Sequence, residues 1–207
     1  SKFFGDKKKN YYKEDIYVGY RYFETCAKDK VQYPFGFGLS YTDFDMLSQI
    51  KEVTKDKVQV SVKVTNTGKV AGKEVIQVYV EAPQGKLGKP TRVLAGFIKS
   101  GVILPEQAEE LTIDCLKSYF ASYDDAGVTG HKSCLLLEEG EYKIYVGSNV
   151  RTAAYCGNWR QETEILEQLE EACAPIEEFE RYKLTMANDA NYLIGMESVP
   201  VRSINPI

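Results

Sequence analysis

The sequence predicts a mainly β protein: an antiparallel β-sandwich with irregular arms at its N-terminal and C-terminal ends. Two observations predict this fold class. Between residues 44 and 150, apolar and polar residues alternate in short segments that are separated by Gly, Pro and Asn turns. The same region shows no helical pattern of the kind that joins parallel strands. We therefore expect stacked antiparallel sheets rather than an α/β fold.

Five segments carry the strand pattern. In the first, four valines alternate with polar residues, as in a strand with one buried and one solvated face, and the turn residues Asn66 to Lys69 follow it. The second is rich in β-branched and aromatic residues and ends before Pro83. The five predicted strands are residues 58–64, 74–80, 92–99, 109–115 and 141–147.

The two ends of the chain differ from this centre. Residues 1–43 are rich in Tyr, Phe, Gly and Lys and show no sustained period. For residues 162–173 two interpretations stay open: Ile165, Leu166 and Leu169 fit one helical face, whereas the sandwich needs a last strand there. Residues 171–207 are expected to form an extended connector, in which Pro200 and Pro206 discourage helix.

The composition excludes several function classes. The chain has 207 residues, of which 43% are hydrophobic, a formal charge of -4 and a pI near 5.3. This charge gives no general attraction for nucleic acid or anionic lipid, so neither is expected as a partner. No stretch approaches the roughly 20 apolar residues of a membrane span. No Gly-rich phosphate loop occurs, and we expect no cofactor.

The five cysteines are odd in number and widely spaced, and no pair has CxxC spacing. A zinc site is therefore not predicted. Reduced thiols in a bacterial cytoplasm are the simpler expectation than a secreted disulfide framework. The segment from Ser1 to Tyr12 also lacks the apolar region of a signal peptide. The cysteines are Cys26, Cys115, Cys134, Cys156 and Cys173.

Several motifs occur together in one order. The long block at residues 33–44 reads YPFGFGLSYTDF and is far more specific than any three-residue pattern. It is preceded by YVGYRYF at residues 17–23 and followed by residues 62–80, 94–97 and 140–147. Over about residues 10 to 150 the chain resembles a family 3 glycoside hydrolase, of which the β-glucosidases are the best-known members. The match is to the end of the α/β-sandwich domain and the fibronectin type III-like domain after it.

The resemblance implies three parts. Residues 1–43 are the tail end of the α/β-sandwich domain and an interdomain wedge, and residues 44–170 are the fibronectin type III-like sandwich. Residues 171–207 are the connector. Its segments 167–175 and 199–202 are similar to the connector in members with inverted domain order, where a (β/α)8 barrel follows.

The resemblance also implies a parent enzyme that hydrolyses terminal β-D-glucosyl residues. Retaining glycosidases use two carboxylates about 5 to 5.5 Å apart. In the family the nucleophile is an Asp on the barrel and the acid/base is a Glu on the α/β sandwich, and neither motif is present here. We therefore expect no catalytic residue in this chain, which meets the β-glucoside only through the rest of the enzyme. Asp124 and Asp125 are interpreted as solvated loop acids, and His131 as a surface-loop histidine.

Eleven aromatic residues crowd residues 11–44. Buried aromatics dominate interface energetics, so their main interpretation is a contact with neighbouring domains or self-association through this arm. The alternative is the rim of a sugar site near Arg21, or a carbohydrate-binding sandwich module that uses exposed aromatics. Trp159 is predicted to pack in the last strand. The candidate rim or interface residues are Tyr20, Arg21, Tyr22, Tyr33, Phe35, Phe37 and Tyr41.

Overall fold

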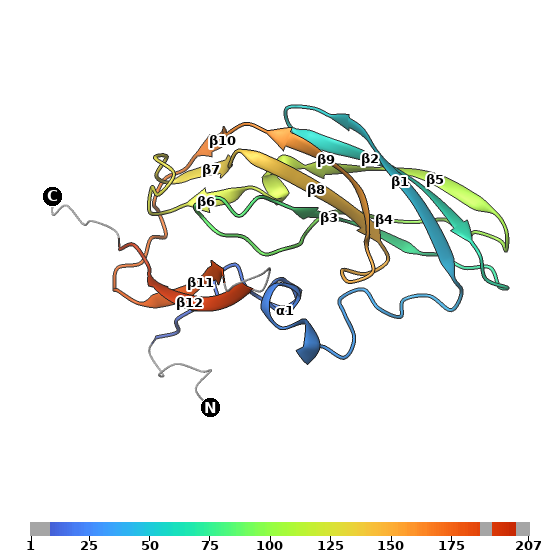
Figure 1. The fold of residues 1–207 in the computed structure, drawn as a ribbon, viewed down its shortest axis with the longest axis horizontal. Helices are drawn as coiled ribbons and strands as arrows, with labels where there is room; N and C mark the ends of the chain where they lie inside the picture. Colours follow the sequence, from blue (N-terminus) through green and yellow to red (C-terminus); the bar gives the residue numbers. More distant parts are fainter. Residues whose placement is uncertain (1–8, 187–191, 202–207) are drawn as a thin grey trace.

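The computed structural model describes residues 9–186 and 192–201 and confirms the predicted fold class. Two antiparallel sheets stack on each other (Figure 1). The three-stranded sheet has the order β1-β2-β5 and the four-stranded sheet the order β4-β3-β8-β9. These strands are β1 (Phe44–Val53), β2 (Lys57–Asn66), β3 (Val75–Glu81), β4 (Val93–Lys99), β5 (Ala108–Leu116), β8 (Gly140–Gly147) and β9 (Ala154–Gln161).

The core lies between the two sheets and follows the alternation in the sequence. The four valines of β2 face inward and are almost fully buried, while the polar residues between them face away from the core. Strands β3 and β8 contribute residues from the opposite sheet. The main core side chains are Val58, Val60, Val62, Val64, Ile76, Val78, Val80, Tyr142, Ile144 and Val146. All five predicted strands are confirmed.

Strand β1 was not predicted, and its sequence shows why. Phe44, Met46 and Ile50 pack against the core, but Ser48 occupies the next inward position and Leu47 is exposed on the other face. These two residues blur the alternation. The strand is held by its antiparallel pairing with β2, which runs from Phe44 opposite Asn66 to Val53 opposite Val58.

A small third sheet, with the order β10-β7-β6, extends the sandwich at one end. Its strands are β6 (Ser122–Asp124), β7 (Cys134–Leu137) and β10 (Glu164–Gln168). Strand β10 settles the open question over residues 162–173: the strand interpretation is confirmed and the helical one is wrong. Leu166 packs against the core, and the edge of β7 supplies the backbone partners that override helix propensity.

The expectation of an extended connector is wrong for the described part of residues 171–207. The chain forms a hairpin of β11 (Glu180–Met186) and β12 (Tyr192–Ser198), paired from Glu180 opposite Ser198 to Met186 opposite Tyr192. Every second residue of β11 is therefore turned to the same face. Pro200 lies just beyond the paired segment, and Pro206 lies outside the described residues.

The N-terminal arm is irregular except for helix α1 (Tyr20–Cys26) and a short 3₁₀ turn at Lys28–Lys30. Helix α1 contacts β12, and the Tyr182 amide donates a hydrogen bond of 2.7 Å to the Lys13 carbonyl. Figure 1 shows α1 and the hairpin side by side below the sandwich. The two arms therefore form one layer on one side of the domain. No helix among the described residues is long and apolar enough to cross a membrane.

Candidate functional site

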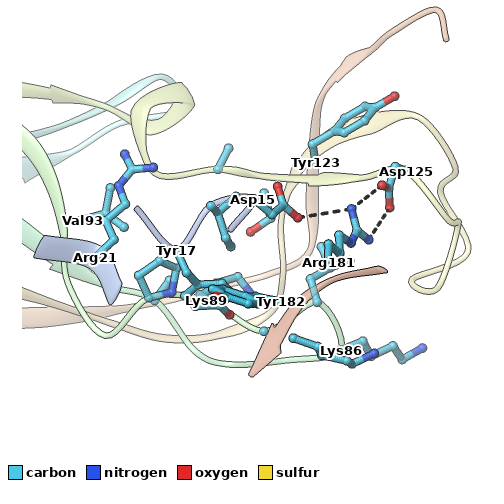
Figure 2. A pocket seen from close by; sticks show the side chains of 18 of the residues that line it. Asp15, Tyr17, Arg21, Lys86, Lys89, Val93, Tyr123, Asp125, Arg181 and Tyr182 are labelled. Atoms are coloured by element: carbon cyan, nitrogen blue, oxygen red, sulfur yellow. Dashed lines mark hydrogen bonds and ion pairs between the residues drawn. The ribbon is translucent and has the colours of Figure 1, made fainter. Parts of the chain in front are cut away.

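A cavity of about 300 Å³ lies where the two arms meet the sandwich (Figure 2). Most of its lining comes from four segments: residues 15–21 of the N-terminal arm, the loop at 82–90, the segment 119–128, and the hairpin β11–β12. Val80, Val93 and Leu135 of the sandwich strands complete it. Segments more than 150 residues apart in the sequence thus share one wall. The cavity exists only because the hairpin folds back onto the sandwich beside the N-terminal arm.

Arg181 organises the charges at this cavity. Its guanidinium forms a bidentate pair with Asp125, with N···O distances of 2.5 and 3.0 Å. It also contacts Asp15 at 3.3 Å and Glu197 at 3.0 Å. Lys183 binds the other oxygen of Glu197 at 2.5 Å. One arginine therefore joins the N-terminal arm, the sandwich and the hairpin, a geometry that suits its planar fork of donors.

These contacts shift the ionisation of the cluster. Burial alone would lower the pKa of Arg181, but the carboxylates of Asp125, Asp15 and Glu197 outweigh it and raise that pKa. Burial also raises the pKa of Asp15, which Arg181 only partly offsets. For Glu197 the hydrogen bonds from Lys183 and Arg181 outweigh burial and hold the pKa below its ordinary value.

We call Arg181 and its three carboxylate partners, Asp15, Asp125 and Glu197, the Arg181 clamp. Its geometry holds three segments together and is not that of a catalytic pair. Each carboxylate that lines the cavity accepts from, or pairs with, the same arginine. A retaining glycosidase needs one free carboxylate nucleophile and one carboxylic acid that keeps its proton near neutral pH. Asp15 additionally has φ 50°, a left-handed conformation that Asp tolerates and that is typical of residues held by their surroundings.

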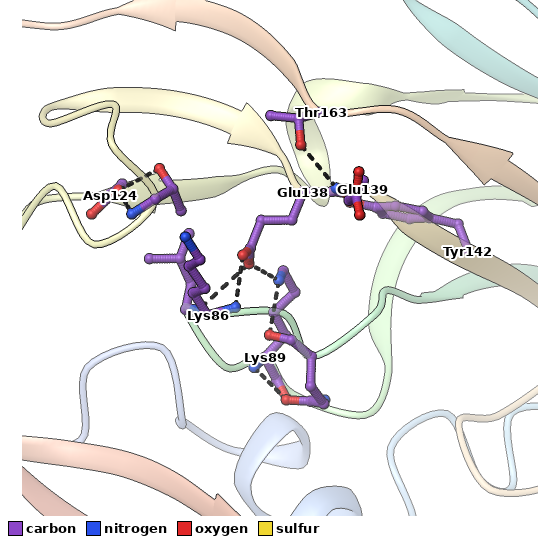
Figure 3. Close-up of polar contacts among 10 residues, drawn as sticks. Lys86, Lys89, Asp124, Glu138, Glu139, Tyr142 and Thr163 are labelled. Carbon is purple, nitrogen blue, oxygen red and sulfur yellow. Dashed lines mark hydrogen bonds and ion pairs between the residues drawn. The ribbon is translucent and has the colours of Figure 1, made fainter.

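The floor of the cavity is a loop held by a buried ion pair. Figure 3 shows Glu138 reaching from the end of β7 toward the loop at residues 84–90. Its carboxylate accepts from the Lys89 ammonium at 2.5 Å and from the Lys86 amide at 2.7 Å. Gly85 has φ 53°, and a Cβ there would lie 2.5 Å from the same carboxylate. Burial lowers the pKa of Lys89, and Glu138 opposes that effect.

Three of the predicted site residues pack in the arm, and they do so in different ways. Tyr20 stacks on Phe35, with ring centroids 5.1 Å apart, and its hydroxyl accepts from the Leu94 amide at 2.8 Å. Its ring also meets the buried Tyr79 edge-on at 6.1 Å. Tyr22 packs near Tyr182 of the hairpin. Tyr20 therefore fastens the arm to β3 and β4 of the four-stranded sheet, and Tyr22 joins it to the hairpin.

Arg21 is the predicted residue that lines the cavity. The remaining three, Tyr33, Phe37 and Tyr41, lie on the exposed surface of the arm, where the Tyr33 and Phe37 rings stack at 5.1 Å. The seven residues therefore belong to an arm contact, a cavity wall and an exposed patch rather than to one site.

Gly36 explains how the segment between these aromatics turns. It has φ 90°, and a Cβ would lie 2.5 Å from the Gln77 side chain and 2.6 Å from the Ser148 carbonyl oxygen. Gly38 also has positive φ, but a Cβ there meets nothing within 4 Å. Gly36 is thus required both for its conformation and for close approach of the arm to the sheet.

The interpretation of the two loop acids as solvated is wrong. Asp124 is fully buried and accepts hydrogen bonds from the Gly127, Val128 and Thr129 amides and from the Thr129 hydroxyl. Burial opposes ionisation, yet these bonds hold the pKa of Asp124 below its ordinary value. Asp125 belongs to the Arg181 clamp.

The other two sequence interpretations concern Trp159 and His131. Trp159 lies in β9 and stacks on Tyr142 at 5.0 Å, which confirms its packing role. His131 is half-buried in a loop.

Sequence reasoning missed four residues of the site: Asp15, Tyr17, Arg181 and Glu197. One sequence pattern could have pointed to Arg181. In residues 180–186 the charged residues Arg181 and Lys183 stand two positions apart, so they share one face of a strand. Nothing in the spacing alone links that strand to the N-terminal arm.

The chain resembles known proteins in sequence. A fibronectin type III-like domain model matches residues 74–150. A β-glucosidase of Ruminococcus albus is 50% identical over 171 residues, which cover 82% of this chain and 18% of that protein. β-Glucosidase A of Butyrivibrio fibrisolvens is 49% identical over 157 residues, or 68% of this chain and 19% of that protein. The chain spans about a fifth of the length of these relatives.

Solved structures agree. A β-glucosidase from Paenibacillus barengoltzii matches 99% of this chain with a TM-score of 0.91 and 46% identity, and the match covers 23% of that protein. β-Glucosidase 3B from Thermotoga neapolitana matches 78% of this chain, and 22% of its own length, with a TM-score of 0.69 and 34% identity. The chain therefore belongs to the family 3 β-glucosidases, in which it corresponds to the fibronectin type III-like region and its flanking arms.

Proposed function

We propose that this chain is a non-catalytic accessory part of a longer enzyme that hydrolyses terminal β-D-glucosyl residues. The observation that carries the proposal is the Arg181 clamp: the carboxylates at the cavity, Asp15, Asp125 and Glu197, are all bound to one arginine. The bond-breaking pair belongs to the remaining domains, and the β-glucoside meets those domains. This chain stabilises and positions them.

The arms supply the mechanical part of this role. Tyr20, Phe35 and Gly36 fasten the N-terminal arm to the sandwich, and Arg181 fastens the hairpin to both. The arm also presents Tyr33, Phe37 and Tyr41 to solvent. Apolar surface of this kind favours association, and we propose that the remaining domains cover it. A barrel that follows the hairpin fits this arrangement, as the similarity of the tail to inverted-order members implies.

A chimera tests the scaffolding role. The matching segment of the Ruminococcus albus β-glucosidase is exchanged for this chain, and β-glucoside turnover and melting temperature are measured. We expect a folded chimera whose KM is close to that of the starting enzyme, because the reacting groups lie outside the exchanged part. A chimera that folds with the same melting temperature but has lost turnover contradicts the proposal.

The absence of catalysis is tested on the isolated chain. We expect no hydrolysis of a chromogenic β-glucoside. Turnover that Asp15→Asn or Glu197→Gln abolishes, in variants that remain folded, shows instead that the clamp contains working acids.

For the isolated chain we also propose self-association through the same arm surface. Sedimentation velocity is expected to show concentration-dependent association that the double change Tyr33→Ser and Phe37→Ser weakens. The matched change Val102→Ser alters an exposed apolar residue outside the arm and is expected to leave association unchanged. A strictly monomeric chain refutes this part of the proposal.

A cytoplasmic location is proposed from the odd number and wide spacing of the cysteines. Thiol titration of denatured protein isolated without reductant is expected to give five free thiols per chain. Recovery of a disulfide-linked peptide contradicts it.

A further inference from the structure

We propose that the cavity between the arms and the sandwich binds one neutral sugar ring, through Tyr17 and Arg21 on one side and the clamp carboxylates on the other. This goes beyond the accessory role, since it gives the chain a ligand of its own.

The size of the cavity limits the ligand to one ring. Its volume of about 300 Å³ is at the lower end of the roughly 300–1,000 Å³ that small-molecule sites span. The walls come from the N-terminal arm, the sandwich and the hairpin, so a bound ring touches all three. An oligosaccharide needs a longer groove than these walls enclose.

Tyr17 offers a hydroxyl group to the cavity. Its side chain is 3% exposed and lines the cavity, and among the described residues its hydroxyl has no hydrogen-bond partner. The hydroxyl lies 3.6 Å from the position that a Cβ at Gly88 would take. The oxygen itself is open to the solvent in the cavity, because it is not among the side-chain atoms that are shut off from water without a partner. A ligand oxygen can therefore take the place of a water at this hydroxyl.

Arg21 supplies further donors from the same arm. It lines the cavity, and its guanidinium forms no ion pair or hydrogen bond with the part of the chain that the structure describes. Figure 2 places Arg21 on one side of the cavity and Arg181 with its carboxylates on the other, with Tyr17 between them. Arg21 thus brings donors to one side of the cavity, and the Arg181 cluster brings both donors and acceptors to the other, which suits a ligand whose groups both donate and accept.

The charge balance favours a neutral ligand. The three carboxylates, Asp15, Asp125 and Glu197, are matched in number by Arg21, Arg181 and Lys183 among the residues that line the cavity. Two further cations, Lys86 and Lys89, also line the cavity; Lys89 is neutralised by Glu138, and Lys86, like Lys183, is exposed to solvent. The lining is therefore close to neutral. A strongly charged ligand meets like charge on one wall or the other. Hydroxyl groups can donate to the carboxylates and accept from the guanidinium and ammonium groups, so they can bind to both walls.

The remaining walls are aromatic and aliphatic. The rings of Tyr119, Phe120, Tyr123 and Tyr182 line the cavity together with Val80 and Val93. Aromatic walls with a few converging polar groups are typical of small-molecule sites. A pyranose has the matching surface, since its C–H faces are apolar and its hydroxyls lie around the rim.

Titration of this chain with glucose, followed by amide resonances in two-dimensional NMR, tests the site. We expect saturable shifts at residues 15–21 and 181–183 with a Kd in the millimolar range. Tyr17→Phe removes only the hydroxyl and is expected to raise Kd about two- to tenfold, as the loss of one neutral hydrogen bond predicts. Arg21→Met is expected to do the same. The matched control Tyr41→Phe removes a hydroxyl from a fully exposed ring and is expected to leave Kd unchanged.

Three outcomes overturn the site. The first is the absence of saturable shifts well above millimolar glucose. The second is binding that is equal in wild type, Tyr17→Phe and Arg21→Met, which places the sugar elsewhere. The third is tighter binding of glucuronate than of glucose, which indicates an anion site. The melting temperature of each variant shows whether it is folded. If Tyr17→Phe does not fold, the effect of Arg21→Met on Kd tests the site instead. Hydrolysis is assayed separately, so failure here leaves the accessory role untouched.

Discussion

The buried pair of Glu138 and Lys89 gives the sharpest test of how the loop under the cavity is held. Their side chains are 9% and 5% exposed, and the carboxylate also accepts from the Lys86 amide. Glu138→Gln keeps the shape but leaves the Lys89 ammonium buried without its counter-charge. Removing one partner of a buried pair costs about 3–5 kcal/mol. We expect a loss of that size in the free energy of unfolding.

The dependence on pH has a definite sign. Burial lowers the folded-state pKa of Lys89 below that of the unfolded chain, and Glu138 opposes the shift. Between the two pKa values the unfolded chain binds more protons, so stability rises with pH there. Glu138→Gln removes the opposition and widens this window. Part of the lost stability is therefore expected to return as the pH approaches about 10.

Urea unfolding of a double-mutant cycle measures the effect. Lys89→Met combined with Glu138→Gln is expected to be more stable than Glu138→Gln alone, with a coupling energy of about 1–3 kcal/mol. Asp29→Asn makes the same chemical change in the solvent-exposed pair with Lys30 and is expected to have no measurable effect. A loss below about 1 kcal/mol for Glu138→Gln, or losses that simply add in the double variant, refutes the reasoning.

Three further predictions concern the arm, the 124–129 loop and the hairpin. Gly38→Ala is expected to lower the free energy of unfolding by about 1 kcal/mol, because alanine is strained in the left-handed backbone conformation. Gly36→Ala is expected to lower it by about 3 kcal/mol, because the added methyl group also collides with the sheet. Equal losses for the two variants in thermal unfolding argue against that close approach. Asp124→Asn is expected to cost about 2 kcal/mol at pH 7. The stability that Asp124 contributes is full above about pH 4 and is lost as the pH falls through its lowered folded-state pKa. The free energy of unfolding of Asp124→Asn is therefore expected to fall less steeply with decreasing pH than that of the wild type. An equal fall in both proteins contradicts the role given to Asp124. Arg181→Met is expected to release the hairpin while the sandwich stays folded, seen as faster hydrogen exchange of the Tyr182 amide; unchanged exchange refutes the clamp.

Alternation along the chain was sufficient to predict the central sandwich. Strand β2 illustrates the reason: four valines at every second position can share a buried face only in an extended strand. The aromatic arm was also visible in the sequence, as a crowd of rings around Gly36. The stacking of Tyr20 on Phe35 and the approach of Gly36 to the sheet could not be predicted. The first depends on how the arm turns over 15 residues, and the second on Gln77 and Ser148, which lie 41 and 112 residues away.

Local sequence by itself determined the strands that have a strict pattern, the absence of a familiar catalytic motif and the likeness to family 3. Tertiary structure alone decided the rest. Residues 164–168 became a strand because β7 offered an unpaired edge. Residues 180–198 became a hairpin that met the arm, and so Arg181 could gather carboxylates from positions 15, 125 and 197. Ion pairs and cavities arise from segments that folding brings together, and their energies have no counterpart in local propensity.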